Sequence, residues 1–437
     1  MKRSVFWCLL GIALFSIHCT NPTPSNEPKN EASGEKGSSK ETITAEPQAE
    51  PRPEPKAEPR QEMAPEPRSE PRIEPRSEPK AEPRSEPLAD LDASVPEPQP
   101  EPRPELGPEL QPDVNRQWLS SVKCGMKPPT GATLAQIPTK YTGGTCPTFQ
   151  AGTNKLTSGK RKRQFILVLP KNPKAGEQFP VLFLWHWLKG TASKFLKQGE
   201  IQKAADQQRF IAILPESPFD LDLFGLVKLP WPILTTTPKA RFEEEFTFFD
   251  DMLACIAKQY KIDRQCVSSI GVSAGALFTV ALSQARSQTL ANFVSLSGGS
   301  GNSKSGLSNR LIPEFKSPKR KLPGLVLWGG PSDSCVLLNF QQASQDLGKA
   351  LDKNGHFFIE CIHNCKHAEP PVTPPAGQSK YAPIWEFVFR HPFWLKSGQS
   401  PYQVNGWKSP SLNWCGIGKG SASIRTGTCP GQASCPI

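Results

Sequence analysis

Residues 116–437 are predicted to adopt an α/β fold, a mostly parallel sheet with helices on both faces. Short apolar runs alternate there with stretches of roughly 10 to 20 residues whose apolar positions have helical spacing. Residues 21–115 stand apart, because they hold 22 of the 48 prolines and no cysteine. Ten of the twelve cysteines follow in 116–437, an even number that suits a disulfide-bonded, exported domain.

The expected elements follow one another in the order of an α/β unit. Apolar runs ended by proline, glycine or charge predict strands over residues 164–169, 180–185, 210–214, 267–270, 293–296, 324–328 and 357–362. Helical spacing predicts helices over residues 191–208, 242–260, 274–286, 338–353 and 381–389. Functional groups in such folds lie on loops beyond the carboxyl ends of the strands, so we look for chemistry there.

The first 19 residues have the pattern of an export signal. Lys2 and Arg3 precede an apolar segment over residues 5–15, and Cys19 follows. A lipoprotein signal would place a lipid on Cys19, so we expect a lipoprotein anchored at the outer membrane or cell surface. The alternative is a protein that is secreted or periplasmic. No uncharged apolar run of about 18 residues occurs later in the chain.

Residues 20–115 are predicted to be a disordered stalk rich in proline, glutamate and arginine. Between residues 66 and 87 the pattern Glu-Pro-(Arg/Lys)-x repeats without a break, which favours a polyproline II spacer. This stalk is acidic, with 12 basic and 22 acidic residues between 21 and 115, whereas residues 116–437 hold 38 basic and 19 acidic residues. A basic domain suits anionic polysaccharide or an anionic surface. We expect no nucleic acid partner for an exported protein.

A candidate nucleophile follows the predicted strand at 267–270. The sequence Gly271-Val272-Ser273-Ala274-Gly275 is a G-x-S-x-G motif between a strand and a helix. The glycines Gly271 and Gly275 allow the sharp turn that lifts the serine hydroxyl out of the sheet and towards the positive end of the helix. The alternative is a simple tight turn.

The partners of this serine are expected on the two following strand ends. Asp333 lies on the loop after the strand at 324–328, and His363 and His367 lie beyond the strand at 357–362. The order Ser273, Asp333, His367 is typical of this architecture. His367 is preferred as the base because it lies further into the loop, and His363 is the alternative.

An ester-cleaving site also needs two backbone N–H donors for the oxyanion. Ala274, directly after the serine, is expected to supply one of them. Trp187, on the loop after the strand at 180–185, is expected to supply the other, although His186 and Trp187 could instead belong to the core.

The chain resembles the extracellular polyhydroxybutyrate depolymerase and feruloyl esterase family of α/β-hydrolases. The resemblance rests on Lys261-Ile262-Asp263-Arg264 leading into the serine motif, on the His186 loop, and on the His367 segment with its proline, and covers residues 160–395. It implies an α/β-hydrolase fold and a carboxylic ester hydrolase with Ser273, Asp333 and His367 as its triad. The chain departs from the family at Trp187 and Lys366, where glycine is usual.

An apolar segment over residues 217–241 interrupts the alternation of strands and helices. It begins on the side of the sheet where the active site is expected, so Phe219, Phe224 and Trp231 are candidate substrate contacts. The alternative is that the segment only covers the core.

The cysteines allow several disulfide patterns. Cys255 could pair with Cys266, Cys124 could pair with Cys146, and a bridge among Cys335, Cys361 and Cys365 could join the two loops beside Asp333 and His367. A zinc site at Cys361 and Cys365 with the two nearby histidines is a weaker alternative, and we expect no metal.

These observations predict an exported serine esterase that needs no cofactor and acts on a polyhydroxyalkanoate-type polyester or a feruloyl-type polysaccharide ester. A serine peptidase on the same fold is one alternative. An inactive surface lipoprotein that binds anionic polysaccharide is another. The sequence predicts no oligomeric state.

Overall fold

The computed structural model describes residues 112–430 and Cys435. The predicted export signal at 1–19 and all but the end of the predicted stalk at 20–115 lie outside these residues. Helix α1 (Pro112–Ser121) includes residues 112–115, so it begins before the domain boundary predicted at residue 116. Within the described part of the chain, no helix combines the length and the apolar character needed to cross a membrane.

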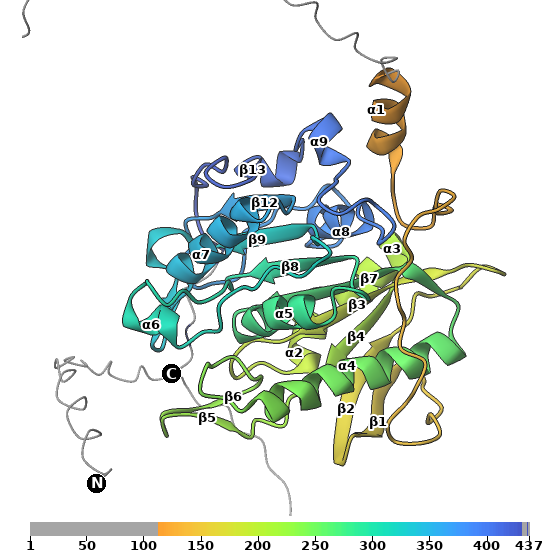
Figure 1. The fold of residues 1–437 in the computed structure, drawn as a ribbon, viewed down its shortest axis with the longest axis horizontal. Helices are drawn as coiled ribbons and strands as arrows, with labels where there is room; N and C mark the ends of the chain where they lie inside the picture. Colours follow the sequence, from red (N-terminus) through yellow and green to blue (C-terminus); the bar gives the residue numbers. More distant parts are fainter. Residues whose placement is uncertain (1–111, 431–434, 436–437) are drawn as a thin grey trace, which may run out of the picture. The chain divides into compact units, whose positions relative to one another are not determined.

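The central sheet has nine strands in the order β1-β2-β4-β3-β7-β8-β9-β12-β13. From β4 to β12 neighbouring strands are parallel, whereas β1, β2 and β13 are antiparallel to their neighbours. The strands of this sheet are β1 (Gly152–Ser158), β2 (Arg161–Val168), β3 (Phe179–Trp185), β4 (Ile211–Pro215), β7 (Ile262–Val272), β8 (Asn292–Leu296), β9 (Gly324–Trp328), β12 (Phe358–Ile362) and β13 (Cys415–Ile417). The mostly parallel sheet predicted from the sequence is thus confirmed (Figure 1).

Helices cover both faces of the sheet because its central strands are apolar on both sides. In β3, Phe183 and Trp185 belong to the core cluster shared with α4, α5 and α7, and Leu182 and Leu184 belong to the cluster shared with α2, α3 and α8. The helices are α2 (Ala192–Gln198), α3 (Ile201–Gln208), α4 (Lys239–Gln259), α5 (Ala274–Ala285), α6 (Leu307–Arg310), α7 (Phe340–Lys353), α8 (Ala382–Phe389) and α9 (Tyr402–Asn405).

The helix predicted over residues 191–208 is two helices. Thr191 caps α2 by accepting a hydrogen bond from the Lys194 N–H, and the helix ends at Gly199. Glu200 then adopts a left-handed conformation before α3 begins at Ile201. The apolar spacing continues across this break, so periodicity alone does not reveal it.

Two short hairpins lie outside the central sheet. The first, β5 (Leu221–Leu223) with β6 (Val227–Leu229), lies within the apolar segment that interrupts the predicted alternation. The second, β10 (Ser334–Cys335) with β11 (Leu338–Asn339), directly follows Asp333. Neither hairpin was predicted, because strands of two or three residues have no measurable periodicity.

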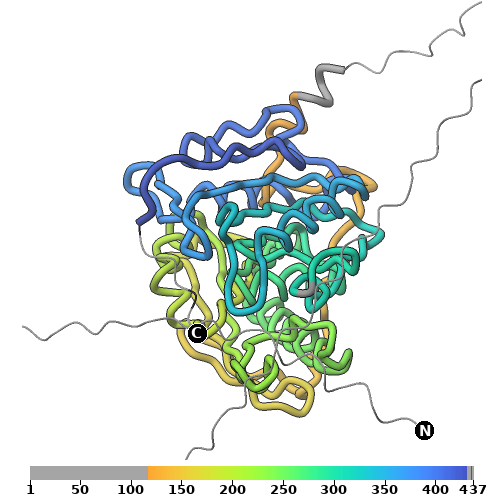
Figure 2. Tube along the Cα trace, turned by 90° about the vertical axis from the view of Figure 1, so that its left-hand side faces the viewer, coloured from red at the N-terminus to blue at the C-terminus, as the bar shows by residue number. Residues whose placement is uncertain are grey.

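Five disulfides join the described residues: Cys124–Cys266, Cys146–Cys255, Cys335–Cys435, Cys361–Cys415 and Cys365–Cys429. All three pairing schemes considered from the sequence are therefore wrong, because every bridge joins segments that are distant in the chain. Two bridges hold the N-terminal extension and three hold the C-terminal extension, which Figure 2 shows in dark blue beside the segment that holds β12. Five bridges indicate folding in an oxidising, extracytoplasmic compartment.

Candidate active site

Ser273 lies at the sharp turn between β7 and α5. Its φ of 55° and ψ of −119° are unusual for a residue with a side chain, as expected for a strained strand-to-helix turn. Its backbone N–H donates to the Leu296 carbonyl of β8, which extends the ladder between β7 and β8 by one bond. The turn thus holds the serine hydroxyl at the carboxyl edge of the sheet.

Gly275 is required because α5 begins against the end of β3. A Cβ atom at Gly275 would lie 2.1 Å from the Trp185 carbonyl oxygen, and one at Gly271 would lie 2.1 Å from the Gly275 carbonyl oxygen. No side chain fits at such distances. The two glycines of the motif therefore bring the start of α5 next to the His186 loop.

Ser273, His367 and Asp333 form a continuous hydrogen-bonded chain. The Ser273 Oγ lies 2.9 Å from the His367 Nε2, and the His367 Nδ1 lies 2.6 Å from the Asp333 Oδ1. The other carboxylate oxygen of Asp333 accepts a 2.7 Å hydrogen bond from the Gly329 N–H. All three side chains are buried, so these hydrogen bonds are shielded from bulk water.

The loops that carry Asp333 and His367 approach each other through their backbones. The Lys366 N–H donates to the Gly329 carbonyl, and a Cβ atom at Gly329 would lie only 1.8 Å from the Lys366 carbonyl oxygen. Lys366 itself has a φ of 60°, in the left-handed region that glycine adopts most easily. The ring of Phe340 stacks on the His367 imidazole at 4.3 Å between centroids and restricts its orientation.

His363, the alternative base, makes no hydrogen bond to Ser273. Its Nδ1 accepts a hydrogen bond from the Cys365 N–H, and its side chain is fully buried. Burial lowers the pKa of His363 to about 4, so this imidazole is neutral at pH 7. His356 and His391 bind serine hydroxyls and backbone carbonyls outside the site.

The backbone N–H groups of Ala274 and Trp187 lie on the two segments that meet at Ser273. Ala274 is the first residue of α5, so its N–H has no partner within the helix. Neither N–H donates to another described part of the chain. His186 is held away from the pocket, with its Nδ1 3.0 Å from the Trp187 carbonyl and its Nε2 3.4 Å from a carboxylate oxygen of Glu216.

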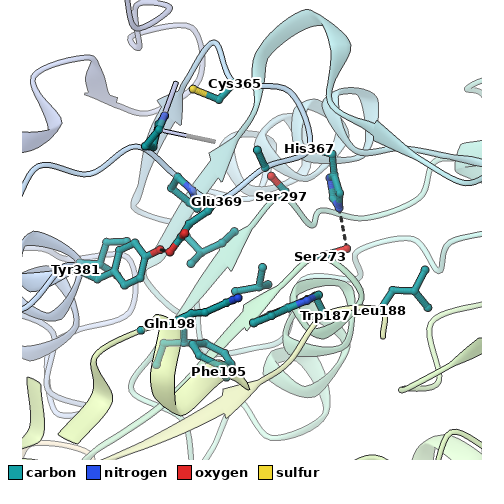
Figure 3. Close-up of a pocket in the computed structure, with 18 of the residues that line it drawn as sticks. Trp187, Leu188, Phe195, Gln198, Ser273, Ser297, Cys365, His367, Glu369 and Tyr381 are labelled. Atoms are coloured by element: carbon teal, nitrogen blue, oxygen red, sulfur yellow. Dashed lines mark hydrogen bonds between the residues drawn. The ribbon is translucent and has the colours of Figure 1, made fainter. Parts of the chain in front are cut away.

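A cavity of about 250 Å³ opens beside Ser273 and His367 (Figure 3). Its walls are mostly apolar and aromatic, and include Trp187, Leu188, Phe195, Tyr381, Ile384 and Trp385. Glu369 also lines it and accepts hydrogen bonds from the Tyr381 hydroxyl and the Lys380 ammonium. The cavity thus has an apolar body with a carboxylate on its wall.

The aromatic residues predicted to contact substrate do not line this cavity. Trp231 is fully buried, and its indole N–H donates to the His186 carbonyl at 2.8 Å. Phe219 stacks on His186, and Phe224 is 62% exposed at the tip of the β5–β6 hairpin. Trp231 therefore has no surface for a ligand, contrary to the prediction. Its hydrogen bond and the stacking of Phe219 show that residues 217–241 support the His186 loop.

Ser297 is a pocket residue that the sequence analysis missed. It follows β8, has a φ of 47°, and is 5% exposed, and its hydroxyl has no hydrogen-bond partner among the described residues. Figure 3 shows it beside His367 and Ser273. Its position after the predicted strand at 293–296 is the signal that could have identified it.

The cysteines of the weaker zinc alternative do not exist as thiolates in this structure. Cys361 is bonded to Cys415, and Cys365 is bonded to Cys429. His367 is already hydrogen-bonded on both ring nitrogens. The chemistry of this donor set therefore does not suit zinc.

No protein-family model and no curated protein matches the sequence. Among solved structures, the chain is similar to a pOPH variant in complex with DMSO, with 16% identity, a TM-score of 0.53, and coverage of 67% of this chain and 99% of that one. A second pOPH variant, in complex with pNPB, has 16% identity, a TM-score of 0.50, and coverage of 65% and 97%. A ferulic acid esterase from Anaeromyces mucronatus has 18% identity, a TM-score of 0.37, and coverage of 54% and 87%. The sheet order, the flanking helices and the likeness to the two pOPH structures show that the chain has the α/β-hydrolase fold.

Proposed function

We propose that this protein is a serine hydrolase of carboxylic esters, with Ser273 as nucleophile, His367 as general base and acid, and Asp333 as the residue that orients His367. The observation that carries the proposal is the hydrogen-bonded chain from Ser273 through His367 to Asp333, at 2.9 and 2.6 Å, beside an apolar cavity. A serine hydroxyl is a weak nucleophile unless such a base takes its proton.

In the first half of the reaction, the Ser273 oxygen attacks the ester carbonyl carbon while its proton passes to the His367 Nε2. The resulting oxyanion accepts hydrogen bonds from the Ala274 and Trp187 N–H groups. The carbon–oxygen bond to the alcohol then breaks, and His367 returns the proton to that alcohol. The Asp333 carboxylate stabilises the imidazolium through its hydrogen bond with Nδ1.

In the second half, water attacks the acyl-serine. His367 takes a proton from this water, the bond between the carbonyl carbon and the serine oxygen breaks, and the proton returns to Ser273. The products are a carboxylic acid and free enzyme, so no cofactor is consumed. Burial of all three side chains supports this cycle, because electrostatic interactions are stronger away from bulk water.

We further propose an exported enzyme with an aliphatic polyester of hydroxyalkanoate type or a feruloyl ester as substrate. The apolar and aromatic walls of the cavity support an apolar or aromatic acyl group. The disulfides support a site of action outside the cytoplasm. The proposal includes a lipid on Cys19, which mass spectrometry of the membrane fraction would detect.

The test is covalent labelling of the full chain with a fluorophosphonate, followed by peptide mass mapping and by nitrophenyl butyrate hydrolysis. We expect the label on Ser273, and a loss of hydrolysis of about 10⁴-fold or more in Ser273→Ala and in His367→Gln. Ser303→Ala, at an exposed serine, is the matched control and should keep full activity. A Ser273→Ala protein that hydrolyses the ester at the normal rate would refute the proposal.

The substrate class is tested on the same preparations with a trimer of 3-hydroxybutyrate and with methyl ferulate. Hydrolysis of either by the unmodified chain, and not by Ser273→Ala, identifies the acyl group. If nitrophenyl butyrate is cleaved and neither of these esters is, the serine mechanism stands and this assignment of the substrate is wrong.

A further inference from the structure

A second cavity lies at the edge of the sheet opposite to Ser273. It has a volume of about 820 Å³ and is formed by the N-terminal extension together with the loops before β8, before β9 and after α8. In Figure 1 this extension is the orange segment on the right of the domain, where these strands begin. We call it the cationic groove, and its main side chains are Trp118, Gln288, Lys319, Arg320, Trp394 and Lys396.

The cationic groove concentrates positively charged side chains, and no acidic side chain lines it among the described residues. The positively charged side chains are Lys319, Arg320 and Lys396. None of the three cations forms an ion pair within residues 112–430. An anionic ligand would therefore meet three positive charges without displacing a carboxylate.

Arg320 holds its charge in an enclosed position. Its guanidinium donates to the carbonyl oxygens of Leu290, Ala291 and Phe393, and it lies over the Phe393 ring at 4.0 Å. Burial lowers the pKa of Arg320 to about 10, which still leaves it charged at pH 7. Arg320 is partly exposed to the groove and has no carboxylate partner among the described residues, so its positive charge adds to those of Lys319 and Lys396 in attracting an anion.

Aromatic side chains give the groove a second recognition element. Trp118 is 40% exposed and lies 5.9 Å from Trp394 between ring centroids. Trp394 is 5% exposed, and its indole N–H has no partner among the described residues. The exposed indole face of Trp118 can pack on the C–H face of a sugar ring.

The walls of the groove are fixed in place. The disulfide Cys124–Cys266 anchors the extension to β7, and the Cys124 N–H donates to the Phe389 carbonyl at the end of α8. On the other side, the Lys321 N–H donates to the Ser397 hydroxyl. A site on such a scaffold loses little entropy when a ligand binds.

We propose that the cationic groove binds an acidic oligosaccharide, such as a chain of uronic acids, with carboxylates at the lysines and Arg320 and a sugar ring on Trp118. The amides of Gln288 and Gln399 add donors and acceptors for sugar hydroxyls. A nucleic acid or an anionic membrane would instead favour a broad cationic face over three cations in one groove. The groove would hold the domain on an acidic polysaccharide and leave the pocket at the opposite edge open.

The test measures binding of the full chain to a galacturonic acid hexasaccharide by titration calorimetry, with the carboxyl-reduced hexasaccharide and a single-stranded DNA of equal charge as comparisons. We expect binding of the acidic sugar alone, weakened by added salt. The double variant Lys319→Ala/Lys396→Ala and the single variant Trp118→Ala should each raise Kd about 10-fold. Lys160→Ala, at an exposed lysine in the β1–β2 turn, is the matched control and should bind normally.

Thermal unfolding of each variant checks that it is folded, and Lys396→Gln replaces the double variant if that protein does not fold. The proposal is overturned if the acidic hexasaccharide does not bind, if the groove variants bind it as the control does, or if DNA binds equally well. Because binding is measured without any ester, this result is independent of the proposed hydrolase activity.

Discussion

Replacing Gly329 with alanine is expected to separate the loops that carry Asp333 and His367. The added Cβ atom would lie 1.8 Å from the Lys366 carbonyl oxygen, whereas real Cβ atoms keep at least 3.0 Å from such a neighbour. The two backbones must therefore move apart by about 1.2 Å. Lys366 directly precedes His367, so the imidazole moves with it.

The size of the effect follows from the geometry of the site. The His367 Nε2 lies 2.9 Å from the Ser273 Oγ, and an added displacement of about 1 Å takes this pair beyond hydrogen-bond distance. A misplacement of this size costs about 100-fold in rate. The strain should also lower the free energy of unfolding by about 1 to 3 kcal/mol.

The assay is nitrophenyl butyrate hydrolysis at a temperature where the variant is folded, with kcat and KM measured separately. We expect kcat to fall about 100-fold and KM to change less, because the cavity walls formed by Trp187, α2 and α8 stay in place. Gly348→Ala, within α7, is the matched control, because the added Cβ atom would lie 3.7 Å from the nearest atom, in the Phe358 ring. Rates for Gly329→Ala within two-fold of the unmodified chain would refute the reasoning.

Three further predictions concern single side chains. Asp333→Asn should lower kcat about 10⁴-fold in the ester assay, because the amide favours the wrong tautomer of His367, and should leave the thermal unfolding temperature unchanged. A variant with normal kcat would show that the carboxylate is dispensable. Ser297→Ala should raise the free energy of unfolding by about 1 kcal/mol in a denaturant titration, because it removes a buried hydroxyl without a partner among the described residues; a less stable variant would contradict this. Burial lowers the pKa of His363 to about 4, so the free energy of unfolding should fall by up to about 3 kcal/mol as the pH drops from 6.5 towards 4, where the unfolded state binds a proton that the folded state does not. His363→Gln should make the free energy of unfolding less dependent on pH in this range. An unchanged slope between pH 7 and 4 would contradict the prediction.

The fold was largely predictable because the buried strands have strong local signals. The strand predicted over residues 324–328 has the bounds observed for β9, and the one over 293–296 is within one residue of β8. The polar edge strand β1, with sequence GTNKLTS, has no such signal, since only one of its faces is buried. Its position depends on pairing with β2, which local sequence does not reveal.

The order of the candidate site residues was also predictable, whereas the pocket walls were not. Ser273, Asp333 and His367 each follow an apolar run, so their place at the carboxyl edge of the sheet could be inferred. The walls come from Trp187, α2 and α8, which meet only in three dimensions. Disulfide pairing was unpredictable for the same reason, since the shortest bridge spans 54 residues.

The site depends on two backbone approaches that only glycine allows. At Gly275, the start of α5 meets the end of β3 and the His186 carbonyl, which brings the segment that begins with Ala274 next to the His186 loop. At Gly329, the end of β9 meets the loop after β12, which brings Asp333 to His367. Lys366 is different, because no backbone lies where its side chain must go. It adopts a φ of 60° with its side chain exposed to solvent and its N–H hydrogen-bonded to the Gly329 carbonyl. In this site, a residue other than glycine is therefore tolerated where only the φ angle is unusual, and it is excluded where two backbone segments are in contact.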